Sequence, residues 1–315
     1  MLAGLAAFGC GSSRDGDGEG GGALDASPPA DSGAREIDSG SKDIDSGPIE
    51  PVVWFVDAVD GDDANDGTRP NIAFRTITRA LLAVGSGDIV QLAPGLYDAA
   101  LGETFPIVVP EGVTLRGDEA TKGADVVVAG NSPSGDIGSA IRPGAGSTLA
   151  GLTVRGVPSG ATVIFGVDLD AWDVTVENCT LTGSGTAAIG VGVASKSIIR
   201  GNFIARNAVY GIAFFGAVAS RVEGNVIRDN GAFGVSFGRG GSDGDLGGGE
   251  TGSAGGNTIA CNGLNDLLIE VGAATIISAA GNAWDHVPPS AADIANRNGS
   301  TIDLTGATLA TDPCP

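Results

Sequence analysis

Basic residues are scarce in this sequence, and their scarcity limits its partners and its chemistry. Lys and Arg together number 17 against 38 Asp and Glu, which gives a formal net charge of −21. Binding to nucleic-acid phosphates needs clustered Lys and Arg, so this charge argues against a nucleic-acid partner. It would also repel a polyanionic substrate unless cations bridged the two. The chain has one histidine, His286, so chemistry that requires a histidine base has a single candidate.

Long apolar runs, a collagen period and a dense set of cysteines are also missing. No apolar run approaches the roughly 18 residues of a membrane-spanning helix. Glycine is abundant, with 54 of 315 residues, but no Gly-X-Y period accompanies it, so a collagen triple helix is excluded. Four cysteines, at positions 10, 179, 261 and 314, are too few for a disulfide scaffold. Apolar residues make up 42% of the chain, which is enough to bury a core.

The first ten residues, MLAGLAAFGC, resemble the end of a bacterial lipoprotein signal, in which the cysteine is lipidated and becomes the new N-terminus. The resemblance predicts lipidation at Cys10 and attachment to the cell envelope, on the outer membrane surface or outside the cell. Three departures from that family's pattern matter. No basic residues precede the apolar segment, which is also short, and Ala7 stands where that family usually has Leu. The alternative is an ordinary N-terminus with an incidental cysteine.

Residues 11–50 contain mainly Gly, Ser, Asp and Pro, with few large aliphatic residues. Asp-Ser-Gly recurs every seven residues, at 31–33, 38–40 and 45–47. Only one apolar position repeats with this period, whereas a coiled coil needs two. The composition is typical of a flexible, solvated tether. It would hold a folded body, residues 51–315, away from a membrane.

The folded body contains an internal repeat that begins with asparagine. Four segments align from their leading asparagines, and a fifth asparagine follows one step later: Asn178, Asn202, Asn225, Asn257 and Asn282. Their spacings are 24, 23, 32 and 25 residues, and the long interval contains a Gly-rich insertion at residues 238–256. Short alternating apolar runs separated by Gly and Asn are typical of short strands with tight turns. Such coils bury their inner face only when they stack.

The leading asparagines have a structural interpretation. Asn tolerates a left-handed backbone at a turn and can bond to the Asn of the next coil. We therefore predict that all five form a ladder without a catalytic role. The aromatic pairs Phe214/Phe237 and Tyr210/Phe233 hold equivalent places in successive repeats, which favours stacking in the core or at turns. A sugar-binding platform would need outward-facing rings.

The repeat pattern resembles the right-handed parallel β-helix of pectin-lyase-like proteins. A more specific resemblance, to the opening of an uncharacterised family of bacterial β-helix proteins and of some polysaccharide lyases, runs from Trp54 to Gly117. It is carried by segments such as Gly-Asp-Asp-Ala-Asn-Asp-Gly-Thr at 61–68, Phe-Arg-Thr-Ile-Thr-Arg-Ala-Leu at 74–81 and Ala-Pro-Gly-Leu-Tyr at 93–97.

This resemblance implies an all-β fold, a single-stranded right-handed parallel β-helix solenoid. It would have roughly ten coils and a length near 50 Å, at about 4.8 Å per coil. Residues 51–117 would form the N-terminal cap and the first coils, with a short capping helix at residues 74–84. Residues 286–315 would form a C-terminal cap or tail.

The densest acidic group in the body is a candidate calcium site. Its members are Asp60, Asp62, Asp63, Asn65 and Asp66. Oxygen ligands at short spacing could bind calcium, which is a hard cation, but their order does not fit an EF-hand loop. A structural loop is the preferred interpretation.

A second acidic group, Asp168, Asp170 and Asp173, is a weak catalytic candidate. On a strand, Asp168 and Asp170 would share a face, and two nearby carboxylates could serve glycoside hydrolysis or bind calcium as in pectate lyases. Those lyases also need a basic residue beside the metal, for which Lys196 and Arg200, one coil later, are the candidates. The Gly-His-Gly signature of β-helix polygalacturonases is absent. A surface acidic patch is the preferred interpretation.

The Gly-rich insertion at residues 238–256 is a candidate contact region. The insertion could contact a partner through Arg239, Asp243, Asp245 or Glu250, with disorder as the alternative.

Export would permit a disulfide, and Cys261–Cys314 is the predicted pair because it would pin the C-terminal tail to the last coils. Cys179 would then be buried and free. The alternative pair, Cys179–Cys261, is less favoured because these cysteines hold different places in their repeats and would not stack. We expect His286, near the C-terminal cap, to be structural.

Together these features predict an exported, lipid-anchored and monomeric β-helix protein. Non-catalytic recognition of a polysaccharide or another cell-envelope component is the leading function. A polysaccharide lyase or glycoside hydrolase is the alternative, and a structural spacer is a third. Membrane contact would occur only through the lipid, and calcium is the single cofactor candidate. An enzyme would require carboxylates and a basic residue clustered on one outer face.

Overall fold

The structure is a computed structural model that describes residues 50–132, 137–157, 163–183, 188–216, 219–238, 244–271, 276–312 and 314. The chain divides into two units, Met1–Pro48 and Ile49–Pro315, and the second contains all of these residues. Cys10, the predicted tether up to residue 49, and Arg239 and Asp243 of the insertion lie outside the described residues.

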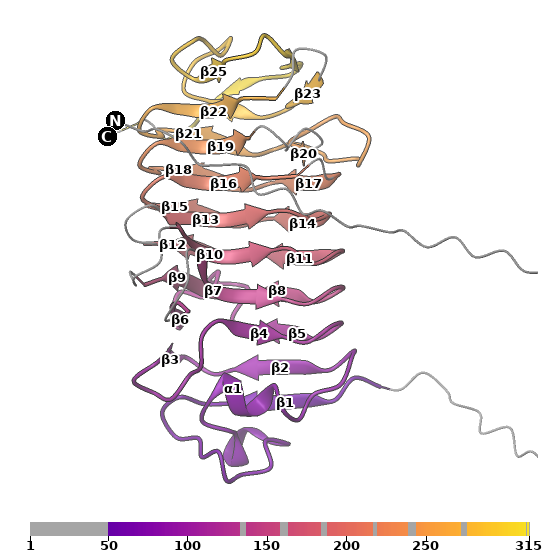
Figure 1. Cartoon of the computed structure of the whole chain (residues 1–315), viewed down its shortest axis with the longest axis vertical. Coiled ribbons are helices and arrows are strands. Elements are labelled where there is room, and N and C mark those ends of the chain that lie inside the picture. The colour runs from indigo at the N-terminus through magenta and orange to yellow at the C-terminus, as the bar shows by residue number, and fades with distance from the viewer. Residues whose placement is uncertain are drawn as a thin grey trace, which may run out of the picture. The chain divides into compact units, whose positions relative to one another are not determined.

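Three parallel sheets, A, B and C, form the second unit (Figure 1). Sheet A contains β1 (Val53–Val56), β2 (Ile89–Leu92), β5 (Thr114–Arg116), β8 (Thr148–Ala150), β11 (Val174–Glu177), β14 (Ser197–Arg200), β17 (Ser220–Glu223) and β20 (Gly244–Asp245). Sheet B contains β3 (Gly95–Asp98), β6 (Val126–Gly130), β9 (Thr153–Gly156), β12 (Thr180–Thr182), β15 (Phe203–Ala205), β18 (Val226–Arg228), β21 (Thr258–Ala260), β24 (Ala283–Trp284) and β27 (Thr308–Leu309). Sheet C contains β4 (Ile107–Val109), β7 (Ile137–Pro143), β10 (Val163–Leu169), β13 (Ala188–Val193), β16 (Tyr210–Phe214), β19 (Phe233–Phe237), β22 (Asn265–Ile269) and β25 (Ile294–Asn296).

The chain passes through sheets A, B and C in turn from β2 to β22, and consecutive strands of each sheet pair in parallel, one coil apart. β23 (Ile276–Ser278) and β26 (Thr301–Asp303) pair with each other in a small fourth sheet, and β24, β25 and β27 extend sheets B and C. Figure 1 shows the strands stacked in this order. The predicted right-handed parallel β-helix is therefore confirmed.

The core lies between the three sheets. In each sheet, inward-facing side chains at equivalent positions of successive coils form a buried column. In three successive coils its members are fully buried: Val176, Ile199 and Val222 in sheet A, Leu181, Ile204 and Ile227 in sheet B, and Val191, Ile212 and Val235 in sheet C. β-Branched side chains fit a pleated surface well. Each fully buried aliphatic side chain contributes roughly 1.5–3 kcal/mol relative to exposure.

Helix α1 (Ile77–Ala80) is shorter than the predicted helix at residues 74–84. Phe74 forms an isolated bridge with Val56, so the chain is still extended there. Thr76 caps the helix, because its side chain accepts a hydrogen bond from the backbone N–H three residues later. The first and last residues of α1 are buried in the core. A short 3-10 helix, η1 (Pro70–Ile72), precedes it.

No helix among the described residues is long and apolar enough to cross a bilayer.

The described part of the insertion, residues 244–256, is an ordered loop, so the disorder considered from the sequence is wrong for this part. The buried carboxylate of Asp245 accepts hydrogen bonds of 2.8–3.0 Å from the N–H groups of Gly247, Gly249 and Ser253 and from the Thr251 hydroxyl. β20 also keeps its place beside β17 in sheet A. One buried acceptor therefore organises a loop whose glycines would otherwise be free to move.

Candidate functional site

Four of the five predicted asparagines form a continuous ladder between sheets A and B. Asn202, Asn225, Asn257 and Asn282 are buried. In each step, the backbone N–H and side-chain amide of one asparagine donate to Oδ1 of the next, at 2.9–3.0 Å. The side-chain amides also donate to backbone carbonyls such as that of Ile199. These bonds satisfy buried polar groups at the turn, so the ladder is structural.

The prediction that Asn178 belongs to this ladder is wrong. The strand register aligns Cys179, and not Asn178, with Asn202, whose Oδ1 accepts the Cys179 N–H at 2.9 Å. Asn178 has a φ of 50° and takes the left-handed turn position that Gly201 and Gly224 hold in the next coils, with φ values of 64° and 63°. Asn and Gly both tolerate this conformation, so the sequence alignment shifted by one residue.

A second ladder, which the sequence analysis missed, lies between sheets B and C. Asn207 donates to Oδ1 of Asn230, and Asn230 donates to Oδ1 of Asn262, at 3.0–3.2 Å. The ladder ends at Asp266, whose Oδ1 accepts the Asn262 side-chain amide at 2.9 Å. Each of these asparagines follows a member of the first ladder by five residues. This spacing was the signal that could have revealed it.

Four of the five predicted calcium candidates form side-chain hydrogen bonds within the N-terminal loop, and the fifth, Asp60, is exposed. Those candidates are Asp60, Asp62, Asp63, Asn65 and Asp66. Asp63 accepts the N–H groups of Arg75 and Thr76 and the Thr76 hydroxyl at 2.8–2.9 Å. Asp62 and Asp66 each accept the N–H two residues later, and the Asn65 amide donates to a backbone carbonyl. Among the described residues, the groups of three carboxylate, Cys or His ligands close enough to share an ion lie elsewhere.

The predicted catalytic candidates separate into different parts of the surface. Asp173 pairs with Lys196, at 3.0 Å, on a turn. Arg200 on β14 pairs with Glu177 on β11, in sheet A. No ion pair within the described part of the chain joins Lys196 or Arg200 to the other two aspartates. The constellation proposed from the sequence is therefore not assembled as predicted.

Asp168 and Asp170 instead meet Arg142, a residue that the sequence analysis missed. Arg142 on β7 is the coil-to-coil neighbour of Asp168 on β10. Its guanidinium lies 3.0 Å from the Asp168 carboxylate and 3.9 Å from that of Asp170. Burial raises the pKa of Asp168, although the bond and the charge of Arg142 oppose the rise. The basic partner was sought one coil later in the sequence, whereas it lies one coil earlier.

Aromatic rings lie next to this ion pair, on the outer face of sheet C. The Phe165 ring covers Gly192, since a Cβ there would lie 2.6 Å from the ring, and Gly192 is the neighbour of Asp168 in the register. Phe215 is 45% exposed and contacts Phe165 edge-on, with centroids 5.8 Å apart. We call Arg142, Phe165, Asp168, Asp170 and Phe215 the sheet C patch.

The two predicted aromatic pairs occupy opposite sides of the sheet. Phe214 and Phe237 stack inside the core, with centroids 4.9 Å apart. Tyr210 packs with Phe165 outside the main core and stacks on Phe233, with centroids 5.7 Å apart. Phe165 and Phe233 are each only 6% exposed and Tyr210 is half-buried, so these rings lie on the outer side of sheet C but are largely covered.

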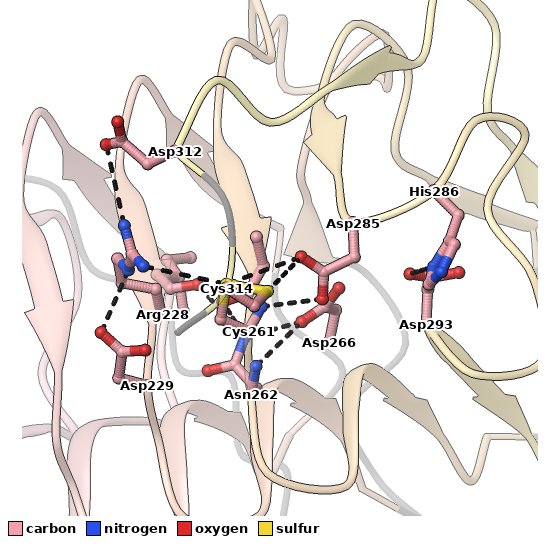
Figure 2. The surroundings of a disulfide bond; sticks show 12 residues. Arg228, Asp229, Cys261, Asn262, Asp266, Asp285, His286, Asp293, Asp312 and Cys314 are labelled. Carbon is pink, nitrogen blue, oxygen red and sulfur yellow. Dashed lines mark hydrogen bonds and ion pairs between the residues drawn. A yellow bond between two sulfur atoms is a disulfide. The ribbon is translucent and has the colours of Figure 1, made fainter.

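A second group of side chains surrounds the disulfide at the C-terminal end (Figure 2). The structure joins Cys261 and Cys314, the predicted pair, with sulfur atoms 2.09 Å apart. Cys179 is buried and free, and burial raises the pKa of its thiol to about 12. Arg228 approaches Cys261 from β18 and pairs with Asp229 and Asp312.

Three carboxylates lie beside this disulfide, with ligand atoms within 4.8 Å of one another. They belong to Asp266 on β22, Asp285 after β24, and Asp293 before β25, and we call them the C-terminal acidic cluster. Burial raises the pKa of Asp266 to about 7. His286, which we predicted to be structural, has its Nδ1 2.8 Å from Asp293, and this hydrogen bond raises the pKa of the imidazole.

Comparison with solved structures finds chains similar to this one at low identity. They include pectate lyase Pel9A (14% identity, TM-score 0.45, 84% of this chain and 80% of that chain). Pectin methylesterase PemA from Erwinia chrysanthemi (13%, 0.41, 69% and 80%) and a GH136 lacto-N-biosidase from Eubacterium ramulus (12%, 0.39, 80% and 55%) are also similar. At these identities and TM-scores, the similarities carry no conclusion about the activity of this chain.

Curated proteins give no significant match to this chain. A sequence family does match, over residues 59–291, which is most of the β-helix. The chain therefore belongs to the family described as "Protein of unknown function (DUF1565)".

Proposed function

We propose that this protein is an exported surface protein that binds a polysaccharide on the sheet C patch without cleaving it. The observation that carries the proposal is the exposed Phe215 ring on the same outer face as the Arg142–Asp168 pair. An aromatic face offers apolar contact to a sugar ring, while an arginine and carboxylates offer hydrogen bonds to its hydroxyl groups.

The register gives the patch a length suited to an oligosaccharide. Asp170, Ala194 and Phe215 hold the same position in successive coils. Asp170 and Phe215 are thus two coils apart, roughly 10 Å at the spacing of parallel strands. Beside this column, the Phe165 ring packs over Gly192 and Ala213.

Charge favours a neutral glycan or one that carries amino groups. The patch contains two aspartates and one arginine, on a chain whose net charge is −21. A polyuronate would therefore be repelled at this surface unless cations bridged it.

The ion pairs argue against catalysis that depends on an unpaired basic side chain. Arg142 is engaged with Asp168, while Lys196 and Arg200 pair with carboxylates elsewhere. Glycoside hydrolysis is nevertheless a second candidate, because Asp168 has a raised pKa and shares Arg142 with Asp170. A carboxyl with a raised pKa beside a second carboxylate is the arrangement of a general acid.

Retention of the full chain on a panel of polysaccharides tests this proposal. We expect retention on at least one neutral or amino-sugar glycan and none on polyuronates without calcium. Phe215→Ala should weaken retention about tenfold, by loss of the ring contact. Leu96→Ala is the matched control, since Leu96 is 47% exposed on sheet B. Absence of retention on every glycan would refute the proposal. Release of reducing ends or unsaturated products would show catalysis and overturn the non-catalytic assignment.

We also propose export and lipid anchoring at Cys10, with the chain as a monomer at the cell envelope. Support comes from the lipoprotein-like N-terminal sequence and from the Cys261–Cys314 disulfide, since such bonds persist in oxidising compartments. Metabolic labelling with a fatty-acid analogue should label the natural chain and not Cys10→Ala. An unlabelled natural chain would contradict the anchor.

A further inference from the structure

We propose that the C-terminal acidic cluster, Asp266, Asp285 and Asp293, is a calcium site that locks the last coils of the β-helix. The three carboxylates come from different segments, and Figure 2 shows Asp266 and Asp285 facing each other beside the disulfide. The site is separate from the sheet C patch and from the acidic loop at residues 60–66.

An unpartnered buried oxygen points to a missing cation. Asp266 is 2% exposed, and its Oδ1 accepts from Asn262, but its Oδ2 is buried without a hydrogen-bond donor. A buried acceptor without a partner costs roughly 1–3 kcal/mol, more if it is charged. The raised pKa of Asp266 reflects the same lack of compensation.

Other carboxylates near this oxygen add negative charge, which a bound cation would neutralise. Asp293 is the coil-to-coil neighbour of Asp266, and Asp266 donates its backbone N–H to the Asp293 carbonyl at 2.8 Å. Oδ1 of Asp285 lies 2.9 Å from the Cys314 sulfur and 3.6 Å from the Cys261 sulfur, which have no proton to donate once they form a disulfide. Like charges on adjacent strands are destabilising unless something neutralises them.

The nearby protein cations do not meet this demand. His286 bonds to Asp293 from the outside, with an exposed side chain. Arg228, on the other side of the disulfide, is engaged by Asp229 and Asp312 (Figure 2). Neither of them forms a hydrogen bond or ion pair with the free oxygen of Asp266.

Calcium fits the available ligands best. The sulfur atoms are bonded to each other, so the cluster offers only oxygen, which hard cations prefer. Calcium binds oxygen at 2.3–2.6 Å, so two of its ligands lie at most about 5 Å apart. The 4.8 Å limit within this cluster meets that condition. Flexible coordination by 6–8 oxygens also leaves room for water beside three carboxylates.

The position of Asp266 in the repeat strengthens the inference. The preceding coils carry Gly190, Gly211 and Gly234 at this place, between the same flanking pairs. An added Cβ at Gly234 would lie 2.6 Å from the Asn262 side-chain amide. Asp266 replaces this glycine at β22, and Asp293 holds the same place one coil later, so the two carboxylates lie side by side, with Asp285 close to both.

Calcium titration of the chelator-treated full chain, by calorimetry and thermal unfolding, tests this site. We expect one calcium per chain, a Kd on the order of 10⁻⁴–10⁻³ M and a midpoint of unfolding that rises by several degrees. Asp266→Asn should lose this response. Without calcium it should be at least as stable as the natural chain, because it removes an uncompensated carboxylate and keeps an acceptor for Asn262.

Asp62→Asn, in the N-terminal acidic loop, is the matched control and should bind calcium normally. Asp285→Asn provides a second variant if Asp266→Asn does not fold, and circular dichroism checks both. A natural chain that binds no calcium at ~10 mM, well above the expected Kd, would overturn the proposal. So would a folded Asp266→Asn or Asp285→Asn chain that binds calcium as tightly as the natural one.

Discussion

The N-terminal acidic loop, residues 60–66, and the C-terminal acidic cluster are both rich in carboxylates but use them in different ways. In the loop, Asp63 accepts three hydrogen bonds from Arg75 and Thr76. In the cluster, Asp266 keeps a buried oxygen without a donor. The loop is denser in sequence, yet only the cluster brings three carboxylates together. A cation site is thus indicated by a buried oxygen without a donor among converging carboxylates, and not by local density of acids.

Local hydrogen bonding explains the difference. Asp and Asn at short spacing bond to the backbone N–H two residues later, as Asp62 and Asp66 do. These carboxylate oxygens already accept hydrogen bonds within the loop and are therefore less available to a metal ion. Asp266 lies one coil before Asp285 and Asp293, and the fold brings the three carboxylates within 4.8 Å of one another. Asp285 and Asp293 also accept backbone N–H groups, from Cys261 and Ser290, but one oxygen of Asp266 stays without a donor.

Removal of the disulfide should produce the largest difference between the two regions. Cys314→Ser opens a link across 53 residues, so we expect the free energy of unfolding in urea to fall by about 2–4 kcal/mol. Limited proteolysis should cut the C-terminal coils first and leave the N-terminal loop intact. Reductant should reproduce the effect in the natural chain and add nothing in Cys314→Ser. Equal protease sensitivity at both ends would show that the disulfide does not hold the C-terminal region.

Loss of Asp63 should produce the next largest effect, at the opposite end. Asp63→Ala leaves two backbone N–H groups and the Thr76 hydroxyl without their acceptor, which should cost about 1–3 kcal/mol in urea unfolding. Asp60→Ala, an exposed carboxylate of the same loop, should change stability by less than about 0.5 kcal/mol. If calcium restored the stability of Asp63→Ala, the loop would be involved in metal binding and the contrast would fail.

The smallest effect concerns acid sensitivity at the N-terminal end. Burial would raise the pKa of Asp88, but hydrogen bonds from Gly85, Trp54 and Val52 outweigh it and hold the pKa below its ordinary value of 3.8. The carboxylate therefore contributes stability above that value, and this contribution is lost as the pH falls through the lower folded-state pKa. As the pH is lowered from 4, the urea midpoint of Asp88→Asn should fall less than the urea midpoint of the natural chain. Parallel declines of the two urea midpoints would contradict this.

The β-helix itself was predictable because its signals are local. Asn202, Asn225 and Asn257 recur with apolar residues at fixed offsets, and stacking is the way such coils bury their inner face. The prediction failed by one residue at Asn178, where Asn replaces a left-handed turn glycine. It also overextended α1, because the bridge between Phe74 and Val56 depends on contacts that the local sequence does not contain.

The sequence alone determined the class of the molecule: a repeat of short strands with a buried asparagine ladder, on a chain with a net charge of −21. Only the tertiary structure decided which side chains meet. Arg142 reaches Asp168, and Asp266 reaches Asp293, because the register places residues 26 and 27 positions apart on adjacent strands. Since loop lengths differ from coil to coil, this register emerges only when the coils stack.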